Sequence, residues 1–442
     1  MHSTTCAAAL AALALFSVLP AVPAAAQQDT AQQKGVHIGL TYQPGTKPGV
    51  VVLPVAGPWG DSVQAMVARD LDYSDRIEII GGTGTDASAV VEQASASTTP
   101  NYGLWKTLGA AAVVAANMTA TGVHVVLHDV NAGRVAQSAD FTLSETPGTE
   151  SWRMAVHGVS DEIERWITGT RGIAQTRILY VRGGHIYVID SDGAGSRAIT
   201  LTGGTALSPA WSPDGRYLTY SQLHAQGWRI MIGDLVTGTV RQVARGGLNE
   251  TPTFSPDGKL LVYAHGGENG TDLMVTNVTG SGTPRPLTAG RGRINIQPSF
   301  SPDGRRLVFT SDRIGHNEVY IMDADGSNAA PLTTYQFGDQ NYRSDPAWSP
   351  DGLQVAFQAR MDGEFQIMTI TLRDRSVTQR TSEGRNEEPS WAPDGRHLVF
   401  TSTRSGAKQL WVLDVESGRE RQLTHSGASR LPAWSGRLGG TP

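Results

Sequence analysis

The chain has 442 residues, a length that predicts two domains of ordinary size, and its 51 glycines and 23 prolines favour a turn-rich β protein. Its net charge is −5, from 36 basic and 41 acidic residues, and no run of Lys or Arg occurs. We therefore expect no nucleic-acid partner, because phosphate binding requires clustered basic side chains.

Residues 1–26 have the pattern of an export signal that is cleaved near Ala26. Residues 7–18 are almost wholly apolar, two prolines follow, and three alanines offer small side chains at the cleavage point. Residues 1–5 carry no Lys or Arg, and a short buried helix is the alternative interpretation. The only cysteine, Cys6, lies in this segment, so we expect a mature protein without disulfides. No later stretch approaches 18 apolar residues, so we expect no membrane-spanning segment.

Residues 27–170 form the predicted N-terminal α/β domain. Apolar runs predict strands at 50–55, 77–80, 111–116 and 123–127. The spacing of apolar residues predicts a helix from Asp61, a short helix near Leu104, and a third helix that begins with the cap Thr146 and Pro147. The glycines in 169–172 mark the expected linker to the second domain.

His124 and His128 have the spacing of a metal pair on a helix, but their segment is patterned as a strand. Four residues of a strand span about 13 Å, so the two side chains are not expected to share an ion. The chain also contains no nucleophile elbow, no His-Glu-x-x-His zinc motif and no phosphate-binding loop with Lys. The motifs therefore predict no enzyme, no metal and no cofactor.

Residues 173–436 contain a repeat, Pro-x-aromatic-Ser-Pro-Asp-Gly, whose prolines are 43 to 48 residues apart. This period is that of one four-stranded β-propeller blade. A shortened copy begins at Pro432, so six copies predict six blades. The five full copies are 209–215, 252–258, 298–304, 346–352 and, with Ala392 in place of Ser, 389–395.

The phase of the repeat predicts how the ring closes. The first blade has candidates for strands two to four at 178–181, 186–190 and 197–200 but lacks the heptapeptide, whereas the chain ends on a spare copy. We expect residues 432–435 to supply the missing first strand, which removes an open sheet edge. The recurring aromatic residue is expected in the core between blades. The Asp-x-Asp-Gly stretches at Asp190 and Asp323 are interpreted as turns rather than calcium loops.

An export signal, an α/β domain and six such blades together resemble the TolB family of the periplasmic Tol-Pal system. The resemblance is carried by Ser-Pro-Ala-Trp-Ser-Pro-Asp-Gly at 208–215 and Pro-Ala-Trp-Ser at 432–435, and it extends over the mature chain. It implies a monomeric, non-enzymatic periplasmic adaptor without cofactors. Its implied partners are the lipoprotein Pal, at one propeller face, and the inner-membrane protein TolA.

The resemblance also implies which residues bind these partners. The TolA-binding segment corresponds to 36–46, where apolar side chains alternate with smaller or polar ones as in a peptide that adds to a sheet edge. A strand paired within its own domain is the alternative. The residues assigned to this segment are Val36, His37, Ile38, Leu40 and Thr41.

For Pal, the implied surface is the propeller mouth, built from loops that enter the first strand of each blade. Polar side chains on rigid strand ends suit specific protein recognition, although ordinary solvated loops are polar too. The residues assigned to this surface are Asn249, Glu250, Asn295, Gln297, Arg343, Asp345, Asn386, Glu387, Glu388 and Arg430.

Two other function classes remain open from sequence. A propeller can gate a prolyl-oligopeptidase-like peptidase, but such an enzyme needs a nucleophile elbow that this chain lacks. A propeller can also bind a carbohydrate or another small ligand in its central funnel.

Overall fold

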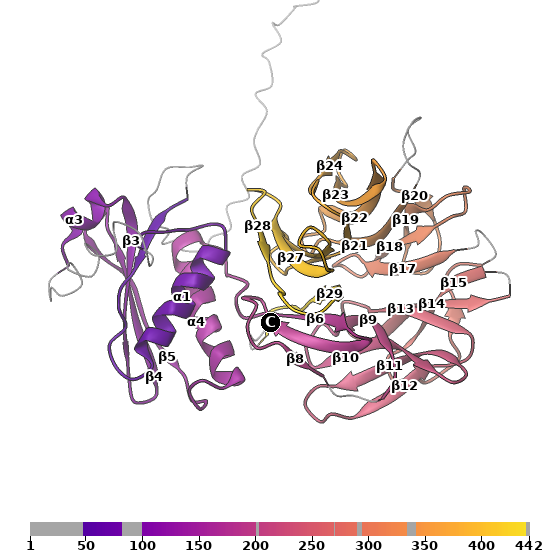
Figure 1. Cartoon of the computed structure of the whole chain (residues 1–442), viewed down its shortest axis with the longest axis horizontal. Helices are drawn as coiled ribbons and strands as arrows, with labels where there is room; N and C mark the ends of the chain where they lie inside the picture. Colours follow the sequence, from indigo (N-terminus) through magenta and orange to yellow (C-terminus); the bar gives the residue numbers. More distant parts are fainter. Residues whose placement is uncertain are drawn as a thin grey trace, which may run out of the picture. The chain divides into compact units, whose positions relative to one another are not determined.

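An N-terminal α/β domain is followed by a six-bladed β-propeller in the computed structural model, as the sequence predicts (Figure 1). The structure describes residues 47–81, 100–199, 203–268, 270–289, 294–333 and 342–438. The predicted export signal and the segment 36–46 lie outside the described residues. Among the helices in the described ranges, none has both the length and the apolar character needed to cross a membrane.

The α/β domain is built on a five-stranded sheet of order β2-β1-β3-β4-β5. Strand β1 is parallel to β2 and β3, and the remaining pairs are antiparallel. The edge strand β5 was not predicted, because it has few apolar side chains and most of them are only half-buried or exposed. The strands are β1 (Gly49–Val52), β2 (Glu78–Ile79), β3 (Ala110–Met118), β4 (Gly122–Asp129) and β5 (Arg134–Thr142).

Helices α1 (Gly60–Tyr73) and α4 (Glu150–Thr168) lie side by side against one face of this sheet (Figure 1). Because strand side chains alternate, Val50 packs against these helices while Val51 packs on the opposite face beside α3 (Tyr102–Thr107). The predicted start of α4 at Thr146 and Pro147 is wrong. The hydroxyl of Thr149 caps the helix by accepting a hydrogen bond from the Trp152 amide at 3.3 Å.

Each blade of the propeller is an antiparallel sheet of four strands. Blade 2 contains β9 (Ala206–Trp211), β10 (Tyr217–His224), β11 (Gly227–Asp234) and β12 (Val240–Ala244). Blade 3 contains β13 (Leu248–Phe254), β14 (Leu260–Gly267), β15 (Gly270–Asn277) and β16 (Arg285–Pro286). Blade 4 contains β17 (Asn295–Phe300), β18 (Arg306–Ser311), β19 (Glu318–Asp323) and β20 (Ala330–Pro331).

Blade 5 contains β21 (Arg343–Trp348), β22 (Gln354–Met361), β23 (Glu364–Thr371) and β24 (Val377–Gln379). Blade 6 contains β25 (Asn386–Trp391), β26 (His397–Ser402), β27 (Gln409–Asp414) and β28 (Glu420–Gln422). Blade 1 combines both ends of the propeller: β29 (Ser429–Trp434) pairs with β6 (Arg177–Arg182), followed by β7 (His185–Asp190) and β8 (Arg197–Ala198). The predicted composite blade is therefore confirmed, and Figure 1 shows β29 beside β6.

The repeated heptapeptide supplies a turn and a contact between blades. The Ser301 hydroxyl donates to Asp303 at 2.5 Å and accepts from the Arg306 amide at 2.9 Å, and Gly304 adopts the left-handed φ of 70° that closes the turn. The indole of Trp391 donates to the Ala347 carbonyl of the preceding blade at 3.0 Å. The expected position of these aromatic residues between blades is thus confirmed.

Candidate functional site

A bulge interrupts the first strand of every blade, directly before the motif proline. Proline has no amide hydrogen to donate to the next strand, and the strand register shifts at this point in all six blades. The residue before each proline has a left-handed φ between 48° and 60°, although none of them is glycine. These bulge residues are Ser208, Thr251, Gln297, Asp345, Glu388 and Leu431.

A left-handed backbone before proline is doubly unfavourable, because both the side chain and the proline ring restrict it. Such conformations persist only where surrounding contacts hold them, and they are frequent at binding sites. Here the six bulge residues, with the prolines that follow them, line a central pocket of about 280 Å³. We call this pocket the funnel.

Hydrogen bonds between neighbouring blades hold the bulge residues in place. The Thr251 hydroxyl accepts from the Gln297 amide at 3.0 Å, and the Gln297 side-chain oxygen accepts from the Asp345 amide at 3.1 Å. In the same way, the Glu388 carboxylate accepts from the Leu431 amide at 2.6 Å. In three blades, then, the bulge side chain fixes the bulge backbone of the next blade, so the funnel wall is preorganised.

Two carboxyl groups give the funnel an acidic side. Burial, reinforced by the negative charges of Glu388 and Glu387, raises the pKa of Asp345 to about 8. Burial also raises the pKa of Glu388, whose carboxylate accepts a second hydrogen bond from Thr401 at 2.7 Å. The described residues that line the funnel include no Lys or Arg. The funnel can therefore accept hydrogen bonds, and Asp345 can carry a proton near neutral pH.

The residues predicted for the mouth lie at the beginnings of the first strands rather than in loops, so the expected loop placement is wrong. Asn249, Asn295 and Asn386 occupy equivalent positions and are fully buried. The Asn249 amide donates to two main-chain carbonyls, at 2.8 and 2.7 Å. These asparagines hold the ends of the blades together, because a buried amide must satisfy its donors within the protein.

The other predicted residues are closer to solvent or take part in ion pairs. Arg430 is exposed, and Glu250 is half-buried. Glu387 is paired with Arg385 at 2.6 Å and Lys408 at 2.8 Å. Arg343 is paired with the buried Glu318 at 2.6 Å. Gln297, Asp345 and Glu388 line the funnel itself.

Sequence reasoning missed Ser208, Thr251 and Leu431, which line the funnel at the same bulge position. The sequence feature that could have revealed these three residues is their shared position, directly before the motif proline of a blade. The two candidate metal histidines make separate contacts: His124 Nδ1 lies 2.8 Å from Asp140, and His128 Nδ1 lies 2.9 Å from the Tyr102 hydroxyl.

A family model described as the TolB beta propeller domain (PD40) matches residues 164–438. The Tol-Pal system protein TolB of Chromobacterium violaceum is 30% identical over 206 residues, which cover 44% of this chain and 46% of that protein. The same protein of Methylococcus capsulatus is 33% identical over 211 residues, covering 44% and 47%. The chain thus spans about half the length of the curated relatives it matches.

The fold is similar to that of a solved structure. The crystal structure of TolB from Acinetobacter baumannii has a TM-score of 0.76 and 24% identity, and the match covers 89% of this chain and 98% of that one. At this identity the likeness shows the fold. Because the family model matches more than half of its residues, the chain belongs to the TolB family.

Proposed function

We propose that this chain is a non-enzymatic periplasmic adaptor of the Tol-Pal system, which links Pal at the outer membrane to TolA at the inner membrane. The observation that carries the proposal is the match of the TolB propeller model to residues 164–438. The curated relatives with 30% and 33% identity are Tol-Pal system proteins. The proposal includes an export signal at residues 1–26, an α/β domain at 27–170 and a propeller at 173–436.

The Pal surface in this proposal is the funnel and its rim. Its rigid wall supports the assignment, since a preorganised surface loses little entropy when a partner binds. The contact residues within reach of a partner are the half-buried and exposed members: Glu250, Gln297, Arg343, Asp345, Glu388 and Arg430. Buried Asn249, Asn295 and Asn386, and Glu387 with its two ion pairs, support the rim from beneath.

The TolA contact in this proposal is the segment 36–46, with Val36, His37, Ile38, Leu40 and Thr41 as contact residues. The first described residue after it, Lys47, places its ammonium 3.8 Å from Asp75, just after α1. A peptide with the alternating pattern of 36–46 can add to the sheet of a partner by main-chain hydrogen bonds.

Isothermal calorimetry with the mature chain tests the proposal. A soluble form of Pal from the same organism is titrated first, and then the periplasmic part of TolA. Measurable binding of both, on one molecule of this chain, is expected of an adaptor. Binding of neither would overturn the proposal, and a turnover of peptide substrates in a parallel assay would favour the peptidase class instead.

A further inference from the structure

The α/β domain and the propeller belong to one compact unit of the structure, and two histidines lie where they meet. His157 is on α4 of the α/β domain, and His397 begins β26 of the propeller. Both are fully buried. Each is held between a carboxylate of its own domain and a carboxylate of the other domain, and the two arrangements are reciprocal.

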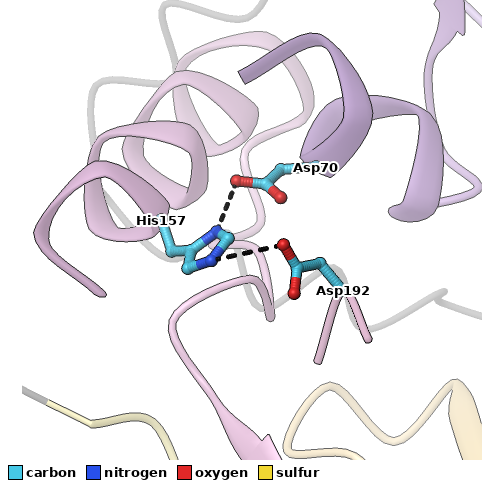
Figure 2. Close-up of side chains that lie close together, drawn as sticks. All are labelled: Asp70, His157 and Asp192. Carbon is cyan, nitrogen blue, oxygen red and sulfur yellow. Dashed lines mark hydrogen bonds and ion pairs between the residues drawn. The ribbon is translucent and has the colours of Figure 1, made fainter. Parts of the chain in front are cut away.

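His157 uses its two ring nitrogens for different domains (Figure 2). Its Nδ1 lies 2.7 Å from Asp70 of α1, whereas its Nε2 lies 3.6 Å from Asp192 in the turn after β7 of blade 1. His397 repeats the pattern from the other side: its Nδ1 lies 2.8 Å from Asp394 of its own blade, and its Nε2 lies 3.4 Å from Asp75, just after α1.

Two facing carboxylates favour a proton on each ring nitrogen, most clearly at His397, while Nε2 of His157 faces both Asp192 and the Arg153 guanidinium. A neutral imidazole has one N–H and one lone pair, so one of its nitrogens would direct a lone pair at a carboxylate oxygen. Only the imidazolium can donate to both carboxylates at once. The second proton therefore strengthens the contact at Nε2 that crosses between domains, because it turns that contact into an ion pair.

We propose that docking of the α/β domain on the propeller is controlled by proton binding at His157 and His397. The proposal rests on the reciprocal placement of the two histidines and is independent of the partners discussed above.

The charged groups around His157 come from three elements. Burial alone would lower its pKa, but the charge and hydrogen bond of Asp70 and the charges of Asp192 and Asp190 outweigh burial and raise the pKa. The guanidinium of Arg153, on α4, lies 3.5 Å from Nε2 and opposes protonation. Arg153 and Arg69 both donate to Asp192, so two cations already occupy this carboxylate. Because two guanidinium groups already neutralise Asp192, a metal ion is disfavoured there. The cation that can be gained or lost at this site is then the proton on His157.

His397 is surrounded more completely by carboxylates. Burial would lower its pKa, but the hydrogen bonds to Asp394 and Asp75 and the charges of Asp394 and Asp414 raise it to about 9. Glu164 faces it from α4. Four neighbouring cations pair with these carboxylates, namely Arg76, Arg396, Arg419 and Lys47, and the charge of the buried Arg421 also acts on Asp75.

The sequence of blade 6 departs from the repeat at this point. In the four other full copies the motif serine donates to the motif aspartate, as Ser212 does to Asp214 and Ser349 to Asp351 at 2.5 Å. Blade 6 has Ala392 instead, and its Asp394 accepts from the His397 ring. Among the five full copies, only the turn with Ala392 lacks the motif serine, and it is this turn whose aspartate contacts the interface residue His397.

The carboxyl groups of Asp161 and Glu164 at the interface also have a raised pKa, like the two histidines. Burial raises the pKa of Asp161 to about 7, and burial with the charge of Asp161 raises that of Glu164 to about 8. In the structure the pKa of each of these four groups lies above its ordinary value, and we infer that undocking returns it toward that value. Docking is therefore strongest below about pH 6.5 as far as the histidines are concerned, and weakens as pH rises toward their docked pKa values.

Hydrogen exchange of the full mature chain tests the proposal. The amides of Ala174 and Gln175 donate across the linker to Asp161 of α4, at 2.7 and 3.1 Å, and report opening of the interface. Corrected for intrinsic exchange, their opening constant is expected to rise up to tenfold per pH unit for each histidine as the pH increases above about 6.5, and the rise due to His397 should end near pH 9. The amide of Phe309, in the core of blade 4, reports global unfolding as an internal reference.

The variants are His157→Asn and His397→Asn, which keep a donor for the own-domain carboxylate but never carry charge. Each is expected to increase opening at pH 7 and to lower the pH slope by up to one proton. His124→Asn is the matched control, because His124 makes the same 2.8 Å contact to Asp140 within one domain. It is expected to behave like the unmodified chain.

Three results would overturn the proposal. The first is an opening constant of the unmodified chain that does not change between pH 6.5 and 9. The second is a pH slope of both interface variants equal to that of the unmodified chain, which would assign the effect to the carboxyl groups. The third is an NMR titration in which both ring protons titrate near pH 6.5, or shift only when a chelator removes a bound metal.

Discussion

The Trp434 indole donates a 2.8 Å hydrogen bond to the Thr176 hydroxyl, and so joins the last strand of the propeller to the residue just before its first. Trp434 is buried, and β29 pairs with β6 on both sides of its bulge. This contact closes the ring, because the first blade has no other first strand.

Removal of residues 432–442 is expected to lower the unfolding free energy by several kcal/mol, since a buried Trp and the β29–β6 hydrogen bonds are lost together. Trp434→Phe keeps most of the apolar contact and should lose about 1 kcal/mol with its hydrogen bond. Urea denaturation measures both. Arg430→Ala, on the exposed side of the same strand, is the control, and an unchanged midpoint for the truncated chain would contradict the composite blade.

Asn249→Ala is expected to destabilise the chain by about 2 kcal/mol, because the carbonyls of Trp228 and Gly246 lose their donor inside the protein. Glu250→Ala, the neighbour with a half-buried side chain, should change stability little. Thermal denaturation compares the two. Equal effects would show that the buried asparagine does not hold the blade ends.

The charged rim is expected to govern Pal binding more than stability. Arg430→Ala should change the Pal dissociation constant by a factor of about 1.4 to 5, more at low salt, because exposed charges contribute about 0.2 to 1 kcal/mol. Arg373→Ala, whose side chain is 90% exposed beside the outer strand β24 of blade 5, is the matched control. Calorimetry that finds the same Pal affinity for both variants and the unmodified chain would reject this rim. Glu388→Lys is unsuitable here, since it would break the hydrogen bonds of Leu431 and Thr401.

Asp345→Asn tests the acidic side of the funnel. The folded-state pKa of about 8 exceeds the ordinary value of 3.8, so the favourable contribution of the protonated group is present at low pH and lost as pH rises. The variant mimics the protonated acid. Its stability relative to the unmodified chain should increase by about 4 kcal/mol at most between pH 5 and pH 9, at about 1.4 kcal/mol per pH unit up to pH 8. Asp374→Asn, at an exposed turn, should show no such trend, and parallel curves for Asp345→Asn and the unmodified chain would contradict the raised pKa.

Deletion of residues 27–42 is expected to abolish TolA binding and leave Pal binding within a few-fold or stronger, because the funnel is built from other residues. If Pal weakens TolA binding by some factor, TolA must weaken Pal binding by the same factor, and the deletion should remove this antagonism. Titration of TolA with and without saturating Pal measures it. Equal affinities would mean two independent sites.

The repeat predicted the blades and the ring closure because each copy carries its own turn chemistry, as Ser301, Asp303 and Gly304 show. It did not predict the bulges, since a left-handed residue before proline is disfavoured locally and is held by contacts from a neighbouring blade. The burial of Asn249 likewise depends on a carbonyl 21 residues away. Asp192 was interpreted as a simple turn residue, because its partners Arg69, Arg153 and His157 come from another domain.

The pairing of β29 with β6 also sets an order of events when the chain is made. A chain emerges with its N-terminal end first, so β6, β7 and β8 exist well before β29 does. Until then blade 1 has an unpaired edge, and long unpaired edges invite association with other chains. The propeller can reach its closed form only after residue 434 has emerged, so the open edge of blade 1 has to stay free of other chains until that moment.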